Sequence, residues 1–220
     1  MCGPCDHGGR MTRIGQERIT DMAKLYFRYG TMDSSKTANA LMVQYNYMEK
    51  KQTAVLLKPQ IEDRDGVRKI RSRIGLEAEC EFVEEFLRRA EEEWFSGKND
   101  AYRGIDCVIV DEAQFLTAEQ VDMFARIVDE LDIPVICYGL RTDFTGHLFE
   151  GSKRLFELAN RLEEVPTVCW CGKKAKFNAR VKDGKIVRTG EQIMMGGNES
   201  YITLCRRHFF EGRLSAEGGI

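Results

Sequence analysis

Residues 30–37, GTMDSSKT, combine side chains and a spacing that suit the binding of a phosphate group. The octet follows the β-rich run KLYFRYG and opens a helical pattern, so backbone N–H groups and a helix N-terminus would face an anion. It departs from the pattern G-x-x-x-x-G-K-[ST] at Ser35, where a second glycine is expected, and it carries an acid at Asp33. Taken alone, the octet fits a phosphate-binding loop and an ordinary polar strand-to-helix turn equally well.

The phosphate-loop interpretation gives each polar residue a task and sets two conditions. Lys36 would reach the outer phosphates of a nucleotide, and the Thr37 hydroxyl would help to hold Mg²⁺. Ser35 fits if its backbone φ is negative, because only glycine takes a positive φ without cost. Asp33 fits if its side chain points away from the phosphates or accepts a backbone N–H. A positive φ at Ser35 would favour an impaired loop.

A second acidic feature favours the phosphate interpretation. The apolar run CVIV ends in Asp111 and Glu112. Ligands of open α/β sheets bind at the carboxyl ends of the strands, where Asp111 fits the acid associated with Mg²⁺. Glu112 projects differently and suits a general base toward a substrate hydroxyl. The alternative is a pair of solvated acids that end a strand, which the nearby loop pattern makes less attractive.

Four potential metal ligands form two pairs, Cys169-x-Cys171 and Cys205-x-x-His208. Three thiolates and one imidazole suit tetrahedral Zn²⁺, and four protein ligands leave no open position, so the site would be structural. The surrounding segment is too small for much of a core, which favours a metal staple over buried thiols and an unrelated surface histidine.

The elements that must position these residues alternate between strand and helix. Apolar runs predict buried strands, amphipathic runs predict helices, and their alternation predicts a parallel sheet covered on both faces. Residues 61–76 are interpreted as a charged loop, and residues 152–162 as a short helix. The expected strands lie in 24–30, 53–58, 104–112 and 133–140, and the other expected helices in 36–51, 80–95 and 117–131.

The sequence pattern changes after Gly151, where the short helix expected in 152–162 leads into a second unit. Two β-like runs flank Asp183-Gly184, a strong signal for a hairpin turn. The prediction is four segments: a flexible N-terminal extension (1–22), an α/β nucleotide-binding core (23–164), a zinc-binding unit (165–212) and a flexible tail (213–220).

Composition narrows the function classes. Among 220 residues, 43% are hydrophobic and 31% charged, and the net charge of −2 gives no support for nucleic-acid or membrane-surface binding by bulk charge. The sequence has no apolar stretch for export or for spanning a membrane, which predicts a cytoplasmic protein. In that compartment the eight cysteines would be thiols or metal ligands.

The order of several strings resembles the type II thymidine kinases, the cytosolic, zinc-containing kind. The strings are LYFRYGTM…SKT, SRIG, VDEAQF, CYGLRTDF, CWCG, MMGGNESY and CRRHFF, and the resemblance covers nearly all of residues 22–212. It implies a RecA-like core with a zinc-stapled lasso domain. It also implies transfer of the γ-phosphoryl of ATP to the 5′-hydroxyl of thymidine, giving dTMP and ADP for pyrimidine salvage.

The resemblance assigns residues to roles. Glu112 is the implied general base, and the implied zinc ligands are Cys169, Cys171, Cys205 and His208. Mg-ATP would contact Gly30, Thr31, Met32, Asp33, Ser34, Ser35, Lys36, Thr37, Asp111, Glu112, Ala113 and Gln114. The nucleoside would lie among Met32, Phe115, Leu140, Phe144, Phe149, Met194, Gly196 and Tyr201, with the lasso EQIMMGGNESY closing over it. An assisting arginine would be Arg64, Arg73 or Arg141, and the sequence does not choose between them.

Members of that family are commonly tetramers, so the resemblance implies a homotetramer with thymidine and ATP as ligands and no nucleic-acid or membrane partner. Beside an active kinase, two other hypotheses stay open. The second hypothesis is a non-catalytic nucleotide-binding relative, with its loop impaired by Ser35 and Asp33. The third is a zinc-ribbon nucleic-acid module on an ATPase. The slightly acidic charge weighs against the last.

Overall fold

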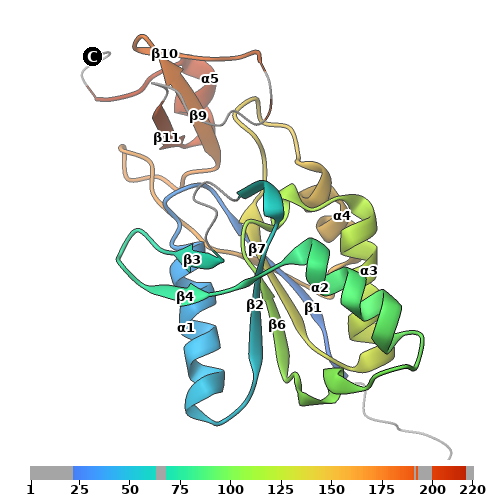
Figure 1. Cartoon of the computed structure of the whole chain (residues 1–220). Coiled ribbons are helices and arrows are strands. Elements are labelled where there is room, and N and C mark those ends of the chain that lie inside the picture. The colour runs from blue at the N-terminus through green and yellow to red at the C-terminus, as the bar shows by residue number, and fades with distance from the viewer. Residues whose placement is uncertain (1–21, 63–67, 191, 193–199, 217–220) are drawn as a thin grey trace, which may run out of the picture.

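The chain folds around one large parallel sheet with a smaller β unit beside it (Figure 1). This computed structural model describes residues 22–62, 68–190, 192 and 200–216, and the side chain of residue 62 is not included. Of the two expected flexible ends, residues 1–21 and 217–220 lie outside the described residues, whereas residues 22 and 213–216 are described. No described helix combines the length and the apolar character that crossing a membrane requires.

The large sheet has the strand order β5-β2-β6-β7-β1-β8, and all five neighbouring pairs are parallel. This confirms the predicted parallel sheet. Its strands are β1 (Leu25–Gly30), β2 (Ala54–Lys58), β5 (Glu81–Phe82), β6 (Cys107–Val110), β7 (Val135–Leu140) and β8 (Arg161–Glu164).

Helices cover both faces of this sheet, as Figure 1 shows. Side chains alternate along each strand, so Val108 and Val110 of β6 belong to one apolar cluster while Cys107 and Ile109 belong to the other. The first cluster includes α2 (Val83–Arg89), α3 (Ala118–Leu131) and α4 (Glu150–Leu158), and the second includes α1 (Lys36–Glu49). Short helical turns complete the unit: η1 (Gln60–Glu62), the π-helical η2 (Ala90–Trp94), η3 (Ala101–Gly104) and η4 (Ala113–Phe115).

Two sequence-based expectations were wrong. The presumed charged loop contains β3 (Lys69–Arg71), which pairs antiparallel with β4 (Glu77–Glu79) just beyond the loop, and the pair docks through buried Ile70 on the α1 side of the sheet. The helix predicted to continue to residue 162 ends at Leu158, and β8 then joins the edge of the sheet. The side chain of Asn160, between them, accepts a hydrogen bond from the Leu25 backbone N–H (2.7 Å). The three strands are only three or four residues long and rich in charged side chains, and Ile70 is the one buried residue among them, so the apolar alternation that marks a strand is too brief to recognise.

The smaller unit, called the Cys/His unit below, comprises the described part of residues 165–212. Its antiparallel sheet has the order β10-β9-β11, formed by β9 (Phe177–Lys182), β10 (Lys185–Ile186) and β11 (Ser200–Leu204), and α5 (Arg206–Glu211) follows. The predicted hairpin turn is confirmed, because Asp183 and Gly184 join β9 to β10 with φ of 49° and 69°. The apolar cluster of this unit is small and separate from those of the large sheet.

Candidate functional site

The loop after β1 is held by close backbone packing at its first residue. A Cβ added to Gly30 would lie 2.5 Å from Ser34 Oγ and 2.6 Å from the carbonyl oxygen of Val165. Any larger residue would therefore push the loop away from the chain that leads into the Cys/His unit. This close approach explains why the first glycine of the octet is present.

The second glycine position does not meet the condition set for an unimpaired loop. Ser35 precedes α1 with φ 56° and ψ 25°, in the left-handed region, where a negative φ was required. The loop keeps the turn that glycine ordinarily makes, at a cost of roughly 1–2 kcal/mol for a residue with a Cβ. Asp33 also has a positive φ, 59°, and its side chain forms an ion pair with Arg73.

Lys36 lies buried within the loop that it is expected to serve. Its Nζ donates to the carbonyl oxygen of Thr31 (2.6 Å) and to Ser34 Oγ (3.2 Å). Burial lowers the pKa of Lys36, while the nearby acids Glu112 and Asp111 oppose that change. An anion at the loop would give this ammonium group a partner in place of a backbone carbonyl.

Asp111 and Glu112 follow β6, two strands from β1 in the sheet, and the structure brings both acids to the loop. Burial, and to a smaller extent the charge of Glu112, raises the pKa of Asp111 to about 7. A hydrogen bond with Thr37 and the charge of Lys36 act in the opposite direction. Glu112 itself has φ 52°, another left-handed residue. Its Oε2 accepts a hydrogen bond from Gln114 Nε2 (2.5 Å), which orients the carboxylate.

The turn after Glu112 is tied to the neighbouring strand and helix. Gln114 is buried, and its Oε1 accepts the backbone N–H of Leu140 at the end of β7 (2.9 Å). Gly151 of α4 packs so closely that an added Cβ would lie 2.6 Å from the carbonyl oxygen of Ala113. The carboxylates therefore stand on a turn that two buried contacts hold in place.

The apolar residues assigned to a nucleoside gather around the segment that joins β7 to α4. The rings of Phe115 and Phe149 meet edge to face with centroids 5.8 Å apart. Phe144 is buried under the guanidinium of Arg180, whose carbon lies 3.7 Å from the ring centroid. Arg180 Nε also donates to the Tyr201 hydroxyl (3.0 Å). Met194 and Gly196 lie outside the described residues.

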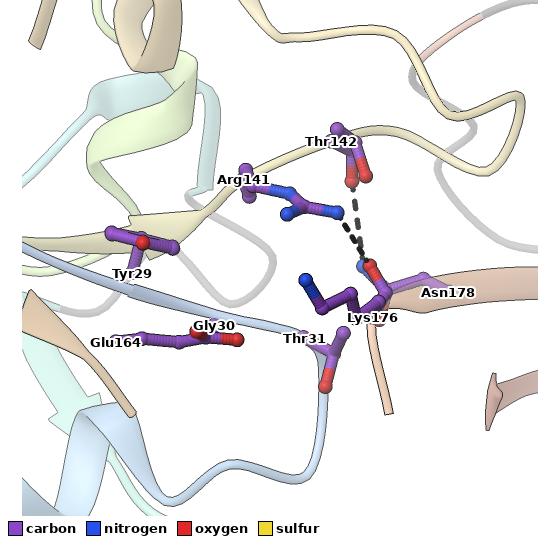
Figure 2. A pocket seen from close by; sticks show the side chains of 8 residues that line it. All are labelled: Tyr29, Gly30, Thr31, Arg141, Thr142, Glu164, Lys176 and Asn178. Carbon is purple, nitrogen blue, oxygen red and sulfur yellow. Dashed lines mark hydrogen bonds between the residues drawn. The ribbon is translucent and has the colours of Figure 1, made fainter. Parts of the chain in front are cut away.

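A shallow hollow lies where the phosphate loop, the end of β7 and the Cys/His unit meet. Figure 2 shows that the two units exchange hydrogen bonds there: Arg141 Nη2 donates to the carbonyl oxygen of Lys176 (3.1 Å), and Asn178 Nδ2 donates to that of Thr142 (3.4 Å). The Asn178 Oδ1 in turn accepts the backbone N–H of Met32 (2.7 Å). The residues that line the hollow are Tyr29, Gly30, Thr31, Arg141, Thr142, Glu164, Lys176 and Asn178.

Sequence reasoning gave no firm role to Asn178 and none to Asp143, yet both organise the site. Asp143 Oδ1 accepts from the backbone N–H groups of Thr145, Gly146 and His147, and Oδ2 accepts from Gln192 Nε2 (2.9 Å). These hydrogen bonds outweigh the effect of partial burial and lower the pKa of Asp143. The signal was present in the string DFTG, since an aspartate three residues before glycine favours a side-chain-closed turn.

The predicted metal ligands converge in the Cys/His unit. One ligand atom from each of Cys169, Cys171, Cys205 and His208 lies within 4.8 Å of all the others. Cys169 Sγ lies 3.4 Å from His208 Nδ1, and Cys171 Sγ lies 4.0 Å from Cys205 Sγ. These separations match the edges of a tetrahedron with Zn–S of about 2.3 Å and Zn–N of about 2.0 Å, so the donor set fits zinc.

The three candidate arginines now differ in their contacts. Arg73 touches the phosphate loop through Asp33, and Arg141 lines the hollow beside Gly30. Arg64 lies outside the described residues. Arg73 and Arg141 thus both approach the loop, from the β3–β4 pair and from the end of β7.

Comparisons with known proteins agree with one another. The family model described as thymidine kinase matches residues 23–209. Similar curated proteins include thymidine kinases of Haemophilus influenzae strain 86-028NP (46% identical; 86% of this chain, 97% of the relative) and Enterococcus faecalis (47%; 86% and 95%). That of Lactococcus lactis is 46% identical over 86% of this chain and 98% of its own length.

Among solved structures, the replication initiator DnaA bound to AMPPCP and single-stranded DNA covers 67% of this chain and 41% of its own. With a TM-score of 0.40 and 17% identity, that likeness is too weak to support a conclusion. The family match and the curated relatives together place the protein: this chain belongs to the thymidine kinase family.

Proposed function

We propose that this protein transfers the γ-phosphoryl group of ATP to the 5′-hydroxyl of thymidine, giving dTMP and ADP. The observation that carries the proposal is the convergence of Lys36, Thr37, Asp111 and Glu112 at one sheet edge, in a member of this kinase family. Phosphoryl transfer depends mainly on positioning and on neutralising charge, and these residues supply both.

Glu112 acts as the general base toward the 5′-hydroxyl in this proposal. Its carboxylate is only partly buried and Gln114 orients it, whereas neighbouring Asp111 is fully buried. A magnesium ion carried by ATP supplies further neutralisation of phosphate charge, and Thr37 and Asp111 are the residues that would hold it. Lys36 exchanges its backbone partner for a phosphate oxygen, and residues 30–37 with Ala113 and Gln114 frame the nucleotide.

The nucleoside occupies the apolar side of the same edge. Phe115, Leu140, Phe144 and Phe149 surround the base, where aromatic faces can pack against a pyrimidine. Met32 and Tyr201 flank the sugar and base from the loop and from β11, and Met194 and Gly196, which lie outside the described residues, complete the proposed set of nucleoside contacts.

The proposed organisation follows the same lines. Residues 23–164 form the nucleotide-binding domain, and residues 165–212 form the lasso domain, in which Cys169, Cys171, Cys205 and His208 hold a structural zinc ion. By similarity to the family we also propose a cytoplasmic homotetramer with no nucleic-acid or membrane partner.

A second candidate is a nucleotide-binding relative that does not catalyse transfer. The positive φ of Ser35 favours it, because this loop carries a backbone cost that a glycine loop avoids. The Asp33 side chain gives the non-catalytic candidate no further support, because it is paired with Arg73. The two candidates differ only in turnover, so a direct assay separates them.

The test is purified, zinc-loaded protein incubated with Mg·ATP and labelled thymidine, with deoxyuridine and deoxycytidine in parallel. We expect dTMP to form with thymidine, and much less product with deoxycytidine. Well-folded protein that binds ATP but forms no dTMP would favour the non-catalytic candidate. Binding of DNA that weakens steeply with salt would instead support a nucleic-acid module.

A further inference from the structure

The acid within the phosphate loop is an unusual neighbour for a polyphosphate. Asp33 lies at the middle of residues 30–37, and its carbonyl oxygen accepts a hydrogen bond from Thr167 Oγ1 (3.3 Å). This contact and the left-handed φ hold the backbone of Asp33 in the loop. A carboxylate carried on that backbone repels phosphate oxygens bound at the loop unless something neutralises it.

Arg73 supplies the opposite charge from a separate element. Arg73 belongs to the turn between β3 and β4, which Ser72 closes. The Ser72 N–H donates to the Leu76 carbonyl (2.8 Å), and the Ser72 Oγ accepts the Leu76 N–H (3.0 Å). Gly75 takes φ 87° in the same turn, and Ile70 anchors the pair of strands beside α1. The turn therefore presents Arg73 to Asp33 across 40 positions of sequence.

Stability does not explain this ion pair. The side chains of Arg73 and Asp33 are 79% and 39% exposed, and exposed pairs contribute little to folding. The described charges around the loop are more informative: Asp33, Asp111 and Glu112 face Lys36, Arg73 and Arg141, so three acids balance three cations. Without Arg73, three acids would face two cations at the place where phosphates bind.

We propose that Arg73 is a positioning residue for the nucleotide: it acts through Asp33, neutralising that carboxylate so that a loop carrying an acid still accepts a triphosphate. The inference rests on the proposed function, because it assumes that residues 30–37 hold the phosphates of ATP. It explains how this octet tolerates Asp33. It also makes the β3–β4 turn part of the nucleotide site.

The experiment is a double-mutant cycle read by nucleotide binding as well as by turnover. Arg73→Gln, Asp33→Asn and the double variant are titrated with a non-hydrolysable Mg·ATP analogue, and KM for ATP is measured separately from kcat. We expect Arg73→Gln to bind the analogue about tenfold more weakly, the effect of one uncompensated charge near a multiply charged ligand, and to raise KM with little change in kcat. Asp33→Asn in the Arg73→Gln background should restore most of that affinity, and Arg73→Lys should lose only about threefold.

Arg71→Gln is the matched control, because Arg71 lies on the same strand pair but forms its ion pair with Glu77. Two results overturn the inference: Arg73→Gln binding no worse than Arg71→Gln, or no rescue by Asp33→Asn, which would mean that Arg73 contacts the nucleotide directly. Lys36→Ala tests the foundation separately. If that variant binds the analogue as well as the unaltered protein, residues 30–37 are not the phosphate site and the proposed function fails along with the inference.

Discussion

The large sheet and the Cys/His unit hold their functional residues by different means. In the sheet, Asp33, Ser35 and Glu112 all have positive φ, on turns held in place by buried contacts at Gly30, Gln114 and Gly151. In the Cys/His unit, four side chains converge on one point above a small apolar cluster. The first arrangement places an unfavourable backbone beside a large core, whereas in the second four potential metal ligands would stabilise a unit whose own core is small.

This difference separates what each unit contributes. Strained turns occur where geometry must be accurate, which fits the placement of a base and a phosphate loop. The Cys/His unit needs only to hold β9 and β11, so that Asn178 reaches Met32 and Arg180, hydrogen-bonded to Tyr201, lies over Phe144. Damage to the sheet turns should therefore abolish chemistry, while damage to the ligand set should weaken nucleoside binding and leave the sheet folded.

Glu112→Gln gives the largest effect if chemistry resides on the sheet. The amide keeps the shape of the side chain and a carbonyl oxygen for Gln114, but it cannot accept the proton of the 5′-hydroxyl. We expect kcat to fall by about 10³-fold, within the range for loss of a general base, while thymidine affinity changes by less than about threefold. Steady-state kinetics measure kcat, and equilibrium binding measures the affinity for thymidine.

The matched control is Glu157→Gln on α4, whose turnover should be normal. Near-normal turnover of Glu112→Gln would show that Glu112 is not the general base.

Removal of one ligand tests the other side of the comparison. Cys205→Ser should reduce bound zinc from about one ion per chain to a small fraction and raise KM for thymidine about tenfold, because β11 and its Tyr201 lose their anchor. The thermal transition of the large sheet should shift little. Metal analysis, kinetics and calorimetry check these three expectations.

Cys137→Ser is the complementary variant. Cys137 is fully buried in β7, so a hydroxyl there should lower the free energy of unfolding by about 1–3 kcal/mol while zinc stays bound. If both variants lose zinc, or if both lower the stability of the large sheet equally, the two units are not supported independently and the comparison fails.

The sequence was most informative where a residue type has one dominant physical use. Continuous apolar runs gave β6 and β7, the helix expected from Thr117 begins there with a Thr117–Gln120 capping box, and Asp183-Gly184 formed the predicted turn. The two ligand pairs met in space as their chemistry required. In each case local chemistry and the tertiary fold demand the same residue.

Prediction failed where tertiary contacts decide. β8 is an exposed charged edge strand that pairs with β1 without any apolar pattern, and the β3–β4 turn carries Arg73 to a loop 40 positions away. Asn178 links Met32 to Thr142 through contacts that no spacing in the sequence reveals. The backbone of Ser35 was likewise left open by the sequence: a residue with a Cβ prefers a negative φ, whereas the structure has φ 56°.

The smallest expected effect measures that backbone conformation directly. Ser35→Gly removes a left-handed cost of roughly 1–2 kcal/mol and adds about 0.5–1 kcal/mol of chain entropy to lose on folding, so the free energy of unfolding should rise by about 0.5 kcal/mol. In a chain of this size that is an increase in Tm of about 1–2 °C, measurable by differential scanning calorimetry.

Ser35→Ala separates the backbone from the hydroxyl, because alanine keeps the Cβ that makes a positive φ costly. It should give no gain in Tm, and the difference between the two variants isolates the effect of φ. If glycine and alanine behave alike, the loop carries no backbone cost at this position, and the argument for an impaired loop disappears. If Ser35→Gly also lowers KM for ATP, the strain at Ser35 opposes nucleotide binding. The phosphates of ATP would then bind to a loop that the large sheet holds in an unfavourable backbone conformation.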